Sequence, residues 1–478
     1  MRSLWVVALL SLVQGCVCLS STVVCGPNNC LGCCDAAGAC KPGTSSAVCG
    51  KGGNTCRACP SAQTCQTQAC TTAGANGFTL TDLDPGALDA TYLAMAIERS
   101  EDRVGVAYFT NAGTQTMPGV PDYDLKYLEW RAGLTSSPQK IRTVQRLAGV
   151  ALGFDPATGE PVVSYLGGGA DTSLFWLQSD AVLNRRTGAT WTETVVATLG
   201  NQVTCGNPIS DRGFLVGLWP TFTWDSTGKL YFASRDAHQG QSGVQDWEGS
   251  DLELWETGFP PTVGTCLAAG DGAGGHSQLV MGLGDQPAII YDRMTTGADV
   301  AAANVYFQRR TAAGTWTPRS SLITLANVQS GPSLAWDPQE GFGVAVLDRA
   351  SNQLLYFNSL DGNFGASDLV FGAGAGGWYP SLAMDPVNHE PAIAFSFCSP
   401  QDLNESGCLT SQDELRVAQR SGGNWNQVVV DVGGGAVPKL GFLSSGKRVL
   451  VYRSPPAIDS MTSQPVLAPG KLKLAVER

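Results

Sequence analysis

Four arginines stand where four predicted apolar strands end, and a planar guanidinium binds carboxylate or sulfate groups through paired hydrogen bonds. If these strands occupy equivalent places in a repeated fold, the four side chains surround a common opening. Such a ring of guanidinium groups would bind an acidic glycan. The alternative is structural, because Asp236, Asp292 and Asp348 adjoin three of these arginines and would form local ion pairs that hold loops. The four candidates are Arg235, Arg293, Arg349 and Arg453.

The predicted loops also offer aromatic rings and carboxylates. Trp247 and Trp378 are candidates for stacking on a sugar ring. A glycosidase or lyase would need two carboxylates in one concave site. Available side chains are Asp236, Glu248, Asp251, Asp292 and Asp348. No serine-hydrolase, phosphate-loop or HExxH motif occurs, and the three histidines, His238, His276 and His389, are far apart. We therefore assign no catalytic residue, no metal ligand and no cofactor.

The bulk composition narrows the possible partners. Hydrophobic residues make up 43% of the 478 and charged residues 15%, which is enough apolar material for a full core. The net charge of −11 is spread along the chain, without the basic clusters that nucleic acid or an anionic membrane surface would require. The sequence predicts neither a nucleic-acid partner nor membrane adhesion, apart from a possible lipid anchor at the N-terminus.

The first twenty residues have the features of an export signal. Arg2 precedes the apolar run Leu4 to Leu12, which is short for a bilayer span. Gly15-Cys16 follows and resembles a bacterial lipobox, in which Cys16 would be acylated; cleavage near Ser20 is the alternative. We expect an exported protein, either a lipoprotein of the outer membrane and cell surface or a secreted one.

Sixteen cysteines agree with an oxidising compartment. Ten lie within 46 residues that contain few apolar side chains, so disulfides must supply the stability that burial cannot. Zinc is the alternative, but the even count, an adjacent pair and the export signal favour disulfides. Their connectivity does not follow from the spacing. The ten are Cys25, Cys30, Cys33, Cys34, Cys40, Cys49, Cys56, Cys59, Cys65 and Cys70. Further along the chain, we expect Cys205 to pair with Cys266 and Cys398 with Cys408.

Internal repeats determine the expected fold of the remainder. Pro332 to Pro338 and Pro380 to Pro386 are near copies, and weaker copies occur on both sides. The turn aspartates Asp155, Asp225, Asp285, Asp337 and Asp385 are spaced by 70, 60, 52 and 48 residues, the length of four short strands with variable loops. Seven such units predict a seven-bladed β-propeller. The strand Leu472 to Val476 is expected to be the third of the last blade, and the lone strand Phe78 to Asp82 is expected to supply its fourth. A β-sandwich array is the alternative, but it does not explain these two unmatched strands.

A Gly-x-Thr-Trp-like turn recurs within several repeats, as in Thr187 to Trp191, Ala313 to Trp316 and Ser421 to Trp425. It resembles the Asp-box turn of sialidase-like (BNR-repeat) propellers, in a degenerate form. The resemblance implies the fold, because these turns are structural. A true sialidase would also have three substrate-gripping arginines, a Tyr-Glu nucleophile pair and an Asp acid/base. The early Arg-Ile-Pro-type motif is absent, so we do not expect sialidase activity.

The cysteine-rich segment has its own resemblance. Gly32-Cys33-Cys34-Asp35, Cys49-Gly50 and Cys56-x-x-Cys59 are similar to the modules that follow the signal peptide of many myxobacterial surface proteins. That likeness implies a protease-resistant spacer between anchor and propeller, with an interaction element as the alternative. The expected organisation is a signal peptide at 1–20, a disulfide module at 21–70, a linker at 71–77 and the propeller at 78–478.

We therefore expect an exported, all-β binding protein whose long-loop face recognises a glycan or a surface protein. Loops are expected to be long after the second strands, at 110–124, 236–251, 292–303, 398–413 and 453–469. Two alternatives remain open: a carbohydrate-active enzyme that uses carboxylates on the same face, and a structural envelope or coat protein.

Overall fold

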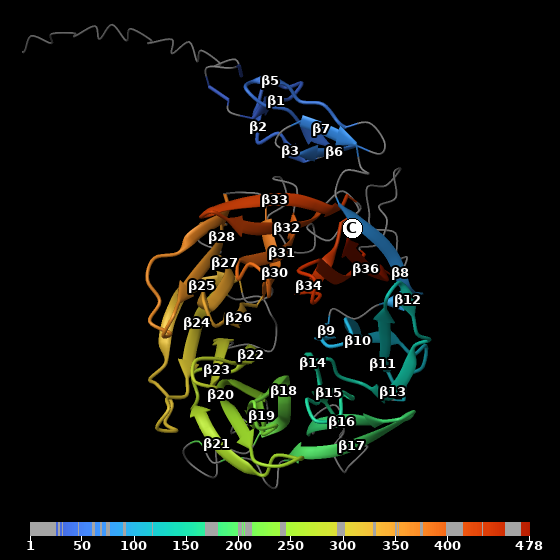
Figure 1. Cartoon of the computed structure of the whole chain (residues 1–478), viewed down its shortest axis with the longest axis vertical. Helices are drawn as coiled ribbons and strands as arrows, with labels where there is room; N and C mark the ends of the chain where they lie inside the picture. Colours follow the sequence, from blue (N-terminus) through green and yellow to red (C-terminus); the bar gives the residue numbers. More distant parts are fainter. Residues whose placement is uncertain are drawn as a thin grey trace, which may run out of the picture.

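The computed structural model describes residues 25–26, 29–30, 32–45, 47–59, 63–66, 69–72, 77–88, 92–116, 118–167, 180–198, 203, 205, 213–239, 245–293, 302–327, 331–348, 351, 353–372, 376–397, 414–432, 434–454 and 470–478. All regular elements within these residues are β-strands. Beyond the cysteine-rich region they form seven blades around one axis (Figure 1), which confirms the predicted seven-bladed propeller. No helix long and apolar enough to cross a membrane occurs in this part of the chain.

The first four blades follow the chain in order, each with its innermost strand first. Blade 1 contains β9 (Leu93–Glu98), β10 (Arg103–Asn111), β11 (Tyr123–Arg131), β12 (Leu134–Thr135) and β13 (Gln139–Val144). Blade 2 contains β14 (Val150–Phe154), β15 (Pro161–Leu166), β16 (Ala181–Thr187) and β17 (Thr190–Ala197). Blade 3 contains β18 (Gly213–Trp224), β19 (Leu230–Gln239), β20 (Gln245–Glu256) and β21 (Val263–Ala268). Blade 4 contains β22 (Gly275–Met281), β23 (Pro287–Asp292), β24 (Ala302–Arg309) and β25 (Ser320–Asn327).

The last three blades return the chain to its start. Blade 5 contains β26 (Ser333–Asp337), β27 (Gly341–Asp348), β28 (Gln353–Ser359) and β29 (Asp368–Phe371). Blade 6 contains β30 (Gly376–Met384), β31 (Pro391–Phe397), β32 (Glu414–Ser421) and β33 (Asn424–Asp431). Blade 7 contains β34 (Ala436–Phe442), β35 (Arg448–Arg453), β36 (Gly470–Glu477) and, as its outer strand, β8 (Phe78–Leu88).

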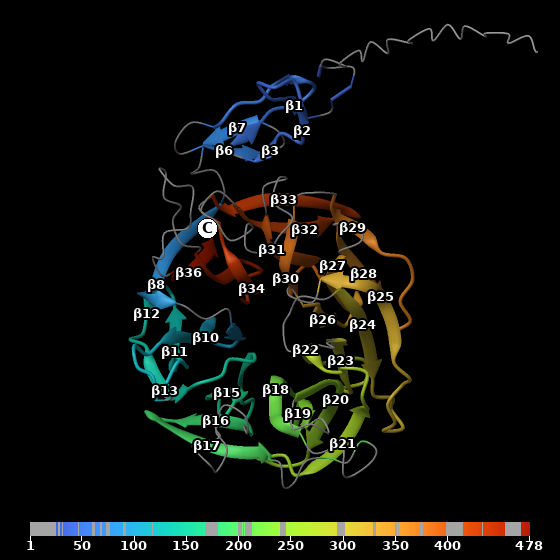
Figure 2. The ribbon, with the colours of Figure 1, turned by 180° about the vertical axis from the view of Figure 1, so that it is seen from behind.

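The ends of the propeller meet in blade 7. β36 and β8 pair antiparallel from Glu477–Phe78 to Gly470–Leu88, so the strand before the first repeat completes the last blade, as the sequence predicted. Figure 2 shows this closure from the opposite side. A linear array of sandwiches has no such pairing, so this alternative is wrong. Closure also leaves no long sheet edge exposed between first and last blades.

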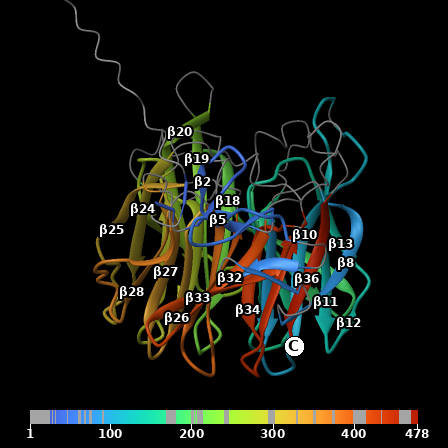
Figure 3. The same ribbon diagram turned by 90° about the horizontal axis from the view of Figure 1, so that it is seen from above.

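The core lies between adjacent blades. The second strands β15, β23 and β31 are buried along their entire length, because each is covered on both faces by neighbouring blades. Such burial explains their continuous apolar sequences. Figure 3 shows the strands from the side, standing roughly along the axis of the ring.

The turn motifs identified in the sequence have structural roles. The carboxylate of Asp155 accepts the backbone N–H of Ala157 (2.9 Å), and Asp385 accepts that of Val387 (2.8 Å). Trp191 of a degenerate Asp-box turn packs edge-on against Tyr127 of the preceding blade, with ring centroids 5.2 Å apart. These residues stabilise turns and blade contacts, which agrees with the structural interpretation of the motif.

A chain of side chain to backbone hydrogen bonds joins consecutive inner strands from blade 3 to blade 7. A polar side chain on each strand accepts the backbone N–H of a residue on the next. The four bonds are Leu279 N–H to Thr221 Oγ1 (2.9 Å), Leu334 N–H to Gln278 Oε1 (2.8 Å), Leu382 N–H to Ser333 Oγ (2.9 Å) and Leu440 N–H to Ser381 Oγ (2.9 Å). We refer to these four bonds as the inter-blade latches. The repeated Pro-Ser-Leu sequence is the signal for two of them.

Replacing Ser333 with Ala is expected to reduce the free energy of unfolding by about 1–3 kcal/mol, because the N–H of Leu382, which is buried, loses its acceptor. Urea unfolding of the purified chain measures the change. Ser444→Ala is the control, since the hydrogen bond from Ser444 to Asp102 is exposed and its loss should change stability by less than about 0.5 kcal/mol. Equal effects of the two substitutions would show that the latch adds nothing.

The cysteine-rich module is held by short strands and disulfides. β1 (Cys33–Cys34) lies between β2 (Cys40–Lys41) and β5 (Asn54–Thr55), and two hairpins follow: β3 (Thr44–Ser45) with β4 (Val48–Cys49), and β6 (Gln63–Gln66) with β7 (Ala69–Thr72). Strand β6 lies next to β33 of the propeller (Figures 1 and 2). The disulfides are Cys25–Cys34, Cys30–Cys40, Cys33–Cys56 and Cys49–Cys65.

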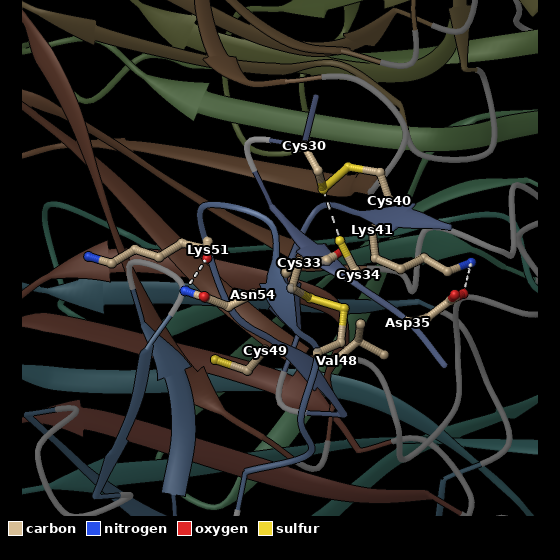
Figure 4. The surroundings of a disulfide bond; sticks show 12 residues. Cys30, Cys33, Cys34, Asp35, Cys40, Lys41, Val48, Cys49, Lys51 and Asn54 are labelled. Carbon is tan, nitrogen blue, oxygen red and sulfur yellow. Dashed lines mark hydrogen bonds and ion pairs between the residues drawn. A yellow bond between two sulfur atoms is a disulfide. The ribbon is translucent and has the colours of Figure 1, made fainter. Parts of the chain in front are cut away.

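These bonds confirm the disulfide interpretation of the module. Figure 4 shows the Cys30–Cys40 disulfide near an ion pair between Lys41 and Asp35 (3.4 Å). Cys59 is also disulfide-bonded, so the clustered sulfur atoms are not available as zinc thiolates. The predicted Cys205–Cys266 disulfide is present and joins the segment before β18 to β21. Cys16, Cys398 and Cys408 lie outside the described residues, as does the side chain of Cys70.

Candidate ligand site in the central channel

The innermost strands of all seven blades line one cavity on the propeller axis. Its volume is about 560 Å³, within the usual range for small-molecule sites. Among the described lining residues Lys439 is the one lysine or arginine, and no aspartate or glutamate is present. The local charge of the channel wall is therefore positive, in contrast to the net charge of the chain.

Four inner strands carry a β-bulge at the same place. The register with the second strand shifts between Leu218 and Thr221 in β18, and the same irregularity interrupts β22, β30 and β34. Three of the bulges contain an X-Pro pair: Trp219-Pro220, Tyr379-Pro380 and Val437-Pro438. Proline has no N–H to donate to a ladder, so it favours a bulge there.

The first residue of each bulge has left-handed backbone. The φ angles are 45° at Trp219, 41° at His276, 54° at Tyr379 and 50° at Val437. Such a conformation costs about 1–3 kcal/mol at a non-glycine residue and is usual at ligand clamps. All four residues line the cavity, and we call them the bulge ring. Bulges commonly redirect side chains next to functional sites, and here they bring four side chains from different blades to one channel.

Two members of the bulge ring have unsatisfied polar tips. The side chains of Trp219 and Tyr379 are each 7% exposed, and neither the indole N–H of Trp219 nor the hydroxyl of Tyr379 has a hydrogen-bond partner in the described structure. Buried tryptophan and tyrosine normally place these groups against a partner. Both residues line the cavity, so their two donors are candidates for contact with a ligand.

His276 is fixed tightly within the ring. Its Nδ1 lies 2.8 Å from Oδ2 of Asp292, a fully buried carboxylate. The indole of Trp219 lies against one side of the imidazole, with ring centroids 5.5 Å apart. A Cβ at Gly331 would come within 2.9 Å of the His276 Cβ, so glycine is required there. The aspartate orients the imidazole, as in catalytic His-Asp pairs.

The predicted arginine ring does not form at this cavity. Arg235 is fully buried in β19, where it donates to Ser250 Oγ (3.0 Å) and lies 5.4 Å from the centre of the Trp219 ring. Arg293 binds Asp271 (2.6 Å) rather than its neighbour Asp292, which pairs with His276. Arg453 ends β35 and is half-buried. None of these three lines the channel, and Arg349 lies outside the described residues.

Among the described residues, the tryptophans, histidines and carboxylates that the sequence offered as candidates do not line the cavity, apart from His276. Trp378 is 5% exposed and packs with Leu347 and Tyr379, so it is not available for stacking on a sugar. Trp247 belongs to β20, but its side chain is not among those described, and neither are those of Glu248 and His238. His389 binds Asp337 of the neighbouring blade at 2.8 Å, a structural contact. The cross-strand neighbours Asp236 and Asp251 are both buried outside the cavity wall.

Sequence reasoning missed the bulge ring. The signal was present, because bulky residues precede proline at equivalent places in three repeats. Of the predicted long loops, 398–413 and most of 292–303 and 453–469 fall outside the described residues. The prediction of a loop at 236–251 is wrong for most of its length, because β19 runs to Gln239 and β20 begins at Gln245. The described part of 110–124 is ordered around Asp122, which is buried and accepts hydrogen bonds from Thr114 and Thr116 (both 2.8 Å from the side-chain hydroxyls).

Fold and site together define an all-β propeller with a disulfide-rich module and a polar site in its channel. No family model and no curated protein matches the chain. Solved structures similar to it include the polysaccharide lyase Uly1 (9% identity, 82% of this chain and 91% of that one, TM-score 0.44). Others are the NanB sialidase of Streptococcus pneumoniae (10%, 84% and 71%, 0.43) and an α-L-arabinanase of Penicillium chrysogenum (13%, 67% and 93%, 0.42). These are propeller enzymes, and at such low identity the likeness is confined to the fold.

Proposed function

We propose that this protein is an exported binding protein whose propeller recognises a carbohydrate at the bulge ring. The observation that supports it most directly is the pair of unsatisfied polar tips on Trp219 and Tyr379, both buried and both on the cavity wall. Sugars present apolar C–H faces for aromatic rings and oxygen acceptors for N–H and O–H donors. The ring offers both within one cavity.

Hydrolysis is disfavoured by the composition of the wall. A glycosidase needs two carboxylates that flank the scissile bond, roughly 5–10 Å apart, and the described lining contains none. Binding without turnover therefore fits the channel better than the glycosidase alternative.

A second candidate is an enzyme in which His276 acts as a general base. The His276–Asp292 pair favours it, because a buried aspartate selects the tautomer that leaves Nε2 as the basic nitrogen. In that case binding would be accompanied by chemical change of the ligand, and His276→Ala would abolish turnover while Tyr379→Phe would mainly weaken binding.

The site of action that we propose is the cell surface or the extracellular medium. The disulfides of the module and of blade 3 support an oxidising compartment. Anchoring through Cys16 remains part of this proposal, and the mass of the mature N-terminus tests it. The partner is a glycan or a glycan-bearing surface protein; a purely structural coat role is the interpretation that remains if no ligand binds.

The test is saturable binding of the oxidised full chain to a glycan array, with product analysis of every hit. We expect Tyr379→Phe to weaken binding about threefold to tenfold, the usual effect of one neutral hydrogen bond. The melting temperature should stay equal or rise, because the substitution removes a buried hydroxyl that has no partner.

Matched controls exist elsewhere in the chain. Tyr356 is 1% exposed and its hydroxyl also has no partner, but it packs between blades and does not line the cavity. Tyr356→Phe should therefore leave binding unchanged. Trp425→Phe is the corresponding control for Trp219→Phe, since the Trp425 indole N–H lacks a partner too. Equal binding by all four variants and the native chain, or no binding to any glycan, would refute the proposed site.

A further inference from the structure

Lys439 is the third residue after the start of β34 and directly follows the Val437-Pro438 bulge. Its half-buried side chain lines the same cavity as the bulge ring. It forms no ion pair and donates no hydrogen bond within the described structure. A lysine on a channel wall without a counter-ion is unusual, because burial of an unpaired ammonium is unfavourable.

No neighbouring strand supplies a compensating carboxylate. β30 and β31 contain no charged residue, and the one carboxylate of β9, Glu98, is at the opposite end, where it accepts hydrogen bonds from Ser100 and Glu101. The charged side chains of β35 are cationic, Arg448 and Arg453. Tyr379 and Tyr452 are the titratable neighbours on β30 and β35; the Tyr452 hydroxyl donates to Asp431 at 2.6 Å. His276 and Tyr92 are the other titratable groups among the described residues of the cavity wall.

Lys439 also interrupts the inter-blade latches. Blades 3 to 6 place Thr221, Gln278, Ser333 and Ser381 at this position of the inner strand, and each accepts a backbone N–H of the next blade. An ammonium group has no acceptor, so a lysine cannot make this bond to blade 1. The residue at this position in blade 7 therefore does not serve the contact that its equivalents serve.

We propose that Lys439 binds an anionic group of the ligand, a carboxylate or a sulfate ester, inside the channel. This inference rests on the proposed function and names its substrate class as an acidic carbohydrate. A desolvated ammonium forms stronger hydrogen bonds to an ionised group than to a neutral one.

The proposal predicts a pH dependence. Burial lowers the pKa of Lys439 to about 8. Lysine is cationic below its pKa, so the anion should bind tightly at pH 7 and weakly at pH 9.5, with the loss centred above pH 8 because the bound anion itself stabilises the charged form. The ionised carboxylate or sulfate of the ligand does not titrate in this range.

The experiment titrates the full chain with three probes at constant ionic strength: inorganic sulfate, tri-galacturonate and the neutral methyl ester of tri-galacturonate. Tryptophan fluorescence reports binding, since Trp219 lines the cavity. We expect saturable binding of sulfate or tri-galacturonate, at least about tenfold weaker in Lys439→Met, and no pH dependence in that variant. Lys471→Met, on the exposed side of the same blade and paired with Asp82, is the control and should bind as the native chain does.

The anion site is refuted if Lys439→Met binds an acidic probe as tightly as the native chain does. It is also refuted if neither sulfate nor tri-galacturonate binds the native chain. If neutral glycans bind and Tyr379→Phe weakens them while Lys439→Met does not, the proposed carbohydrate site stands and only the acidic preference is wrong. Sulfate binding that depends on Lys439 without any glycan binding supports the anion site and refutes the carbohydrate proposal. The melting temperature of Lys439→Met checks folding and should equal or exceed that of the native chain.

Discussion

A chain that begins at residue 90 is expected not to fold cooperatively, whereas one that begins at Gly77 should fold. The difference is β8, which supplies the outer strand of blade 7. Phe78 and Leu83 of this strand are 5% and 6% exposed and belong to the cores on either side of the blade. Burial of two such side chains contributes about 3–6 kcal/mol, a large share of the stability of a domain.

Loss of β8 also exposes a sheet edge. The ladder groups of β36 would face solvent, and an uncovered strand of this length associates readily with other chains. Thermal unfolding followed by circular dichroism, with sedimentation to detect association, measures both effects.

Rescue in trans makes the prediction specific. A peptide of residues 77–89 should restore a cooperative transition to the truncated chain by strand addition. A truncated chain that melts at the same temperature as the 77–478 chain, without the peptide, would show that closure of the ring does not depend on β8.

Substitution of Arg235 by Met is the second large effect and should reduce the free energy of unfolding by about 2–3 kcal/mol. The guanidinium is fully buried and donates to Ser250 Oγ (3.0 Å), which is also buried. Methionine keeps much of the volume but cannot donate this hydrogen bond, and hydrogen bonds made by a charged group are the stronger ones. Trp219 also loses the cation near its ring (5.4 Å), so ligand binding should weaken as well.

Arg293→Met is the matched control. Its side chain is 34% exposed and binds Asp271, which is 32% exposed, so the loss should be no more than about 1 kcal/mol. Urea unfolding of the two variants under the same conditions measures the two losses of stability and shows whether that of Arg235→Met is larger. Equal losses would mean that burial of Arg235 has no energetic consequence.

The arginines show where the sequence-based prediction and the structure differ most. The pattern correctly placed Arg293 next to a strand end and Arg453 at one, because strands and turns follow from local alternation and turn residues. It was wrong for Arg235, since β19 continues beyond it to Gln239. It also could not show that Arg235 packs against Ser250 and Trp219 or that Asp292 binds His276, since those partners come from other strands of the blade. An adjacent Asp-Arg pair suggests a local ion pair, but tertiary packing selected Asp271 for Arg293 instead.

The sequence by itself determined the seven blades, the closing strand and the Cys205–Cys266 disulfide, because each depends on repeat spacing or on equivalent positions in successive repeats. It also contained the X-Pro pairs of the bulge ring. Only the tertiary structure decided that Trp219, His276, Tyr379 and Lys439 share one cavity. They lie on four different blades, and radial closure of the ring, rather than any local pattern, brings residues more than two hundred positions apart to one axis.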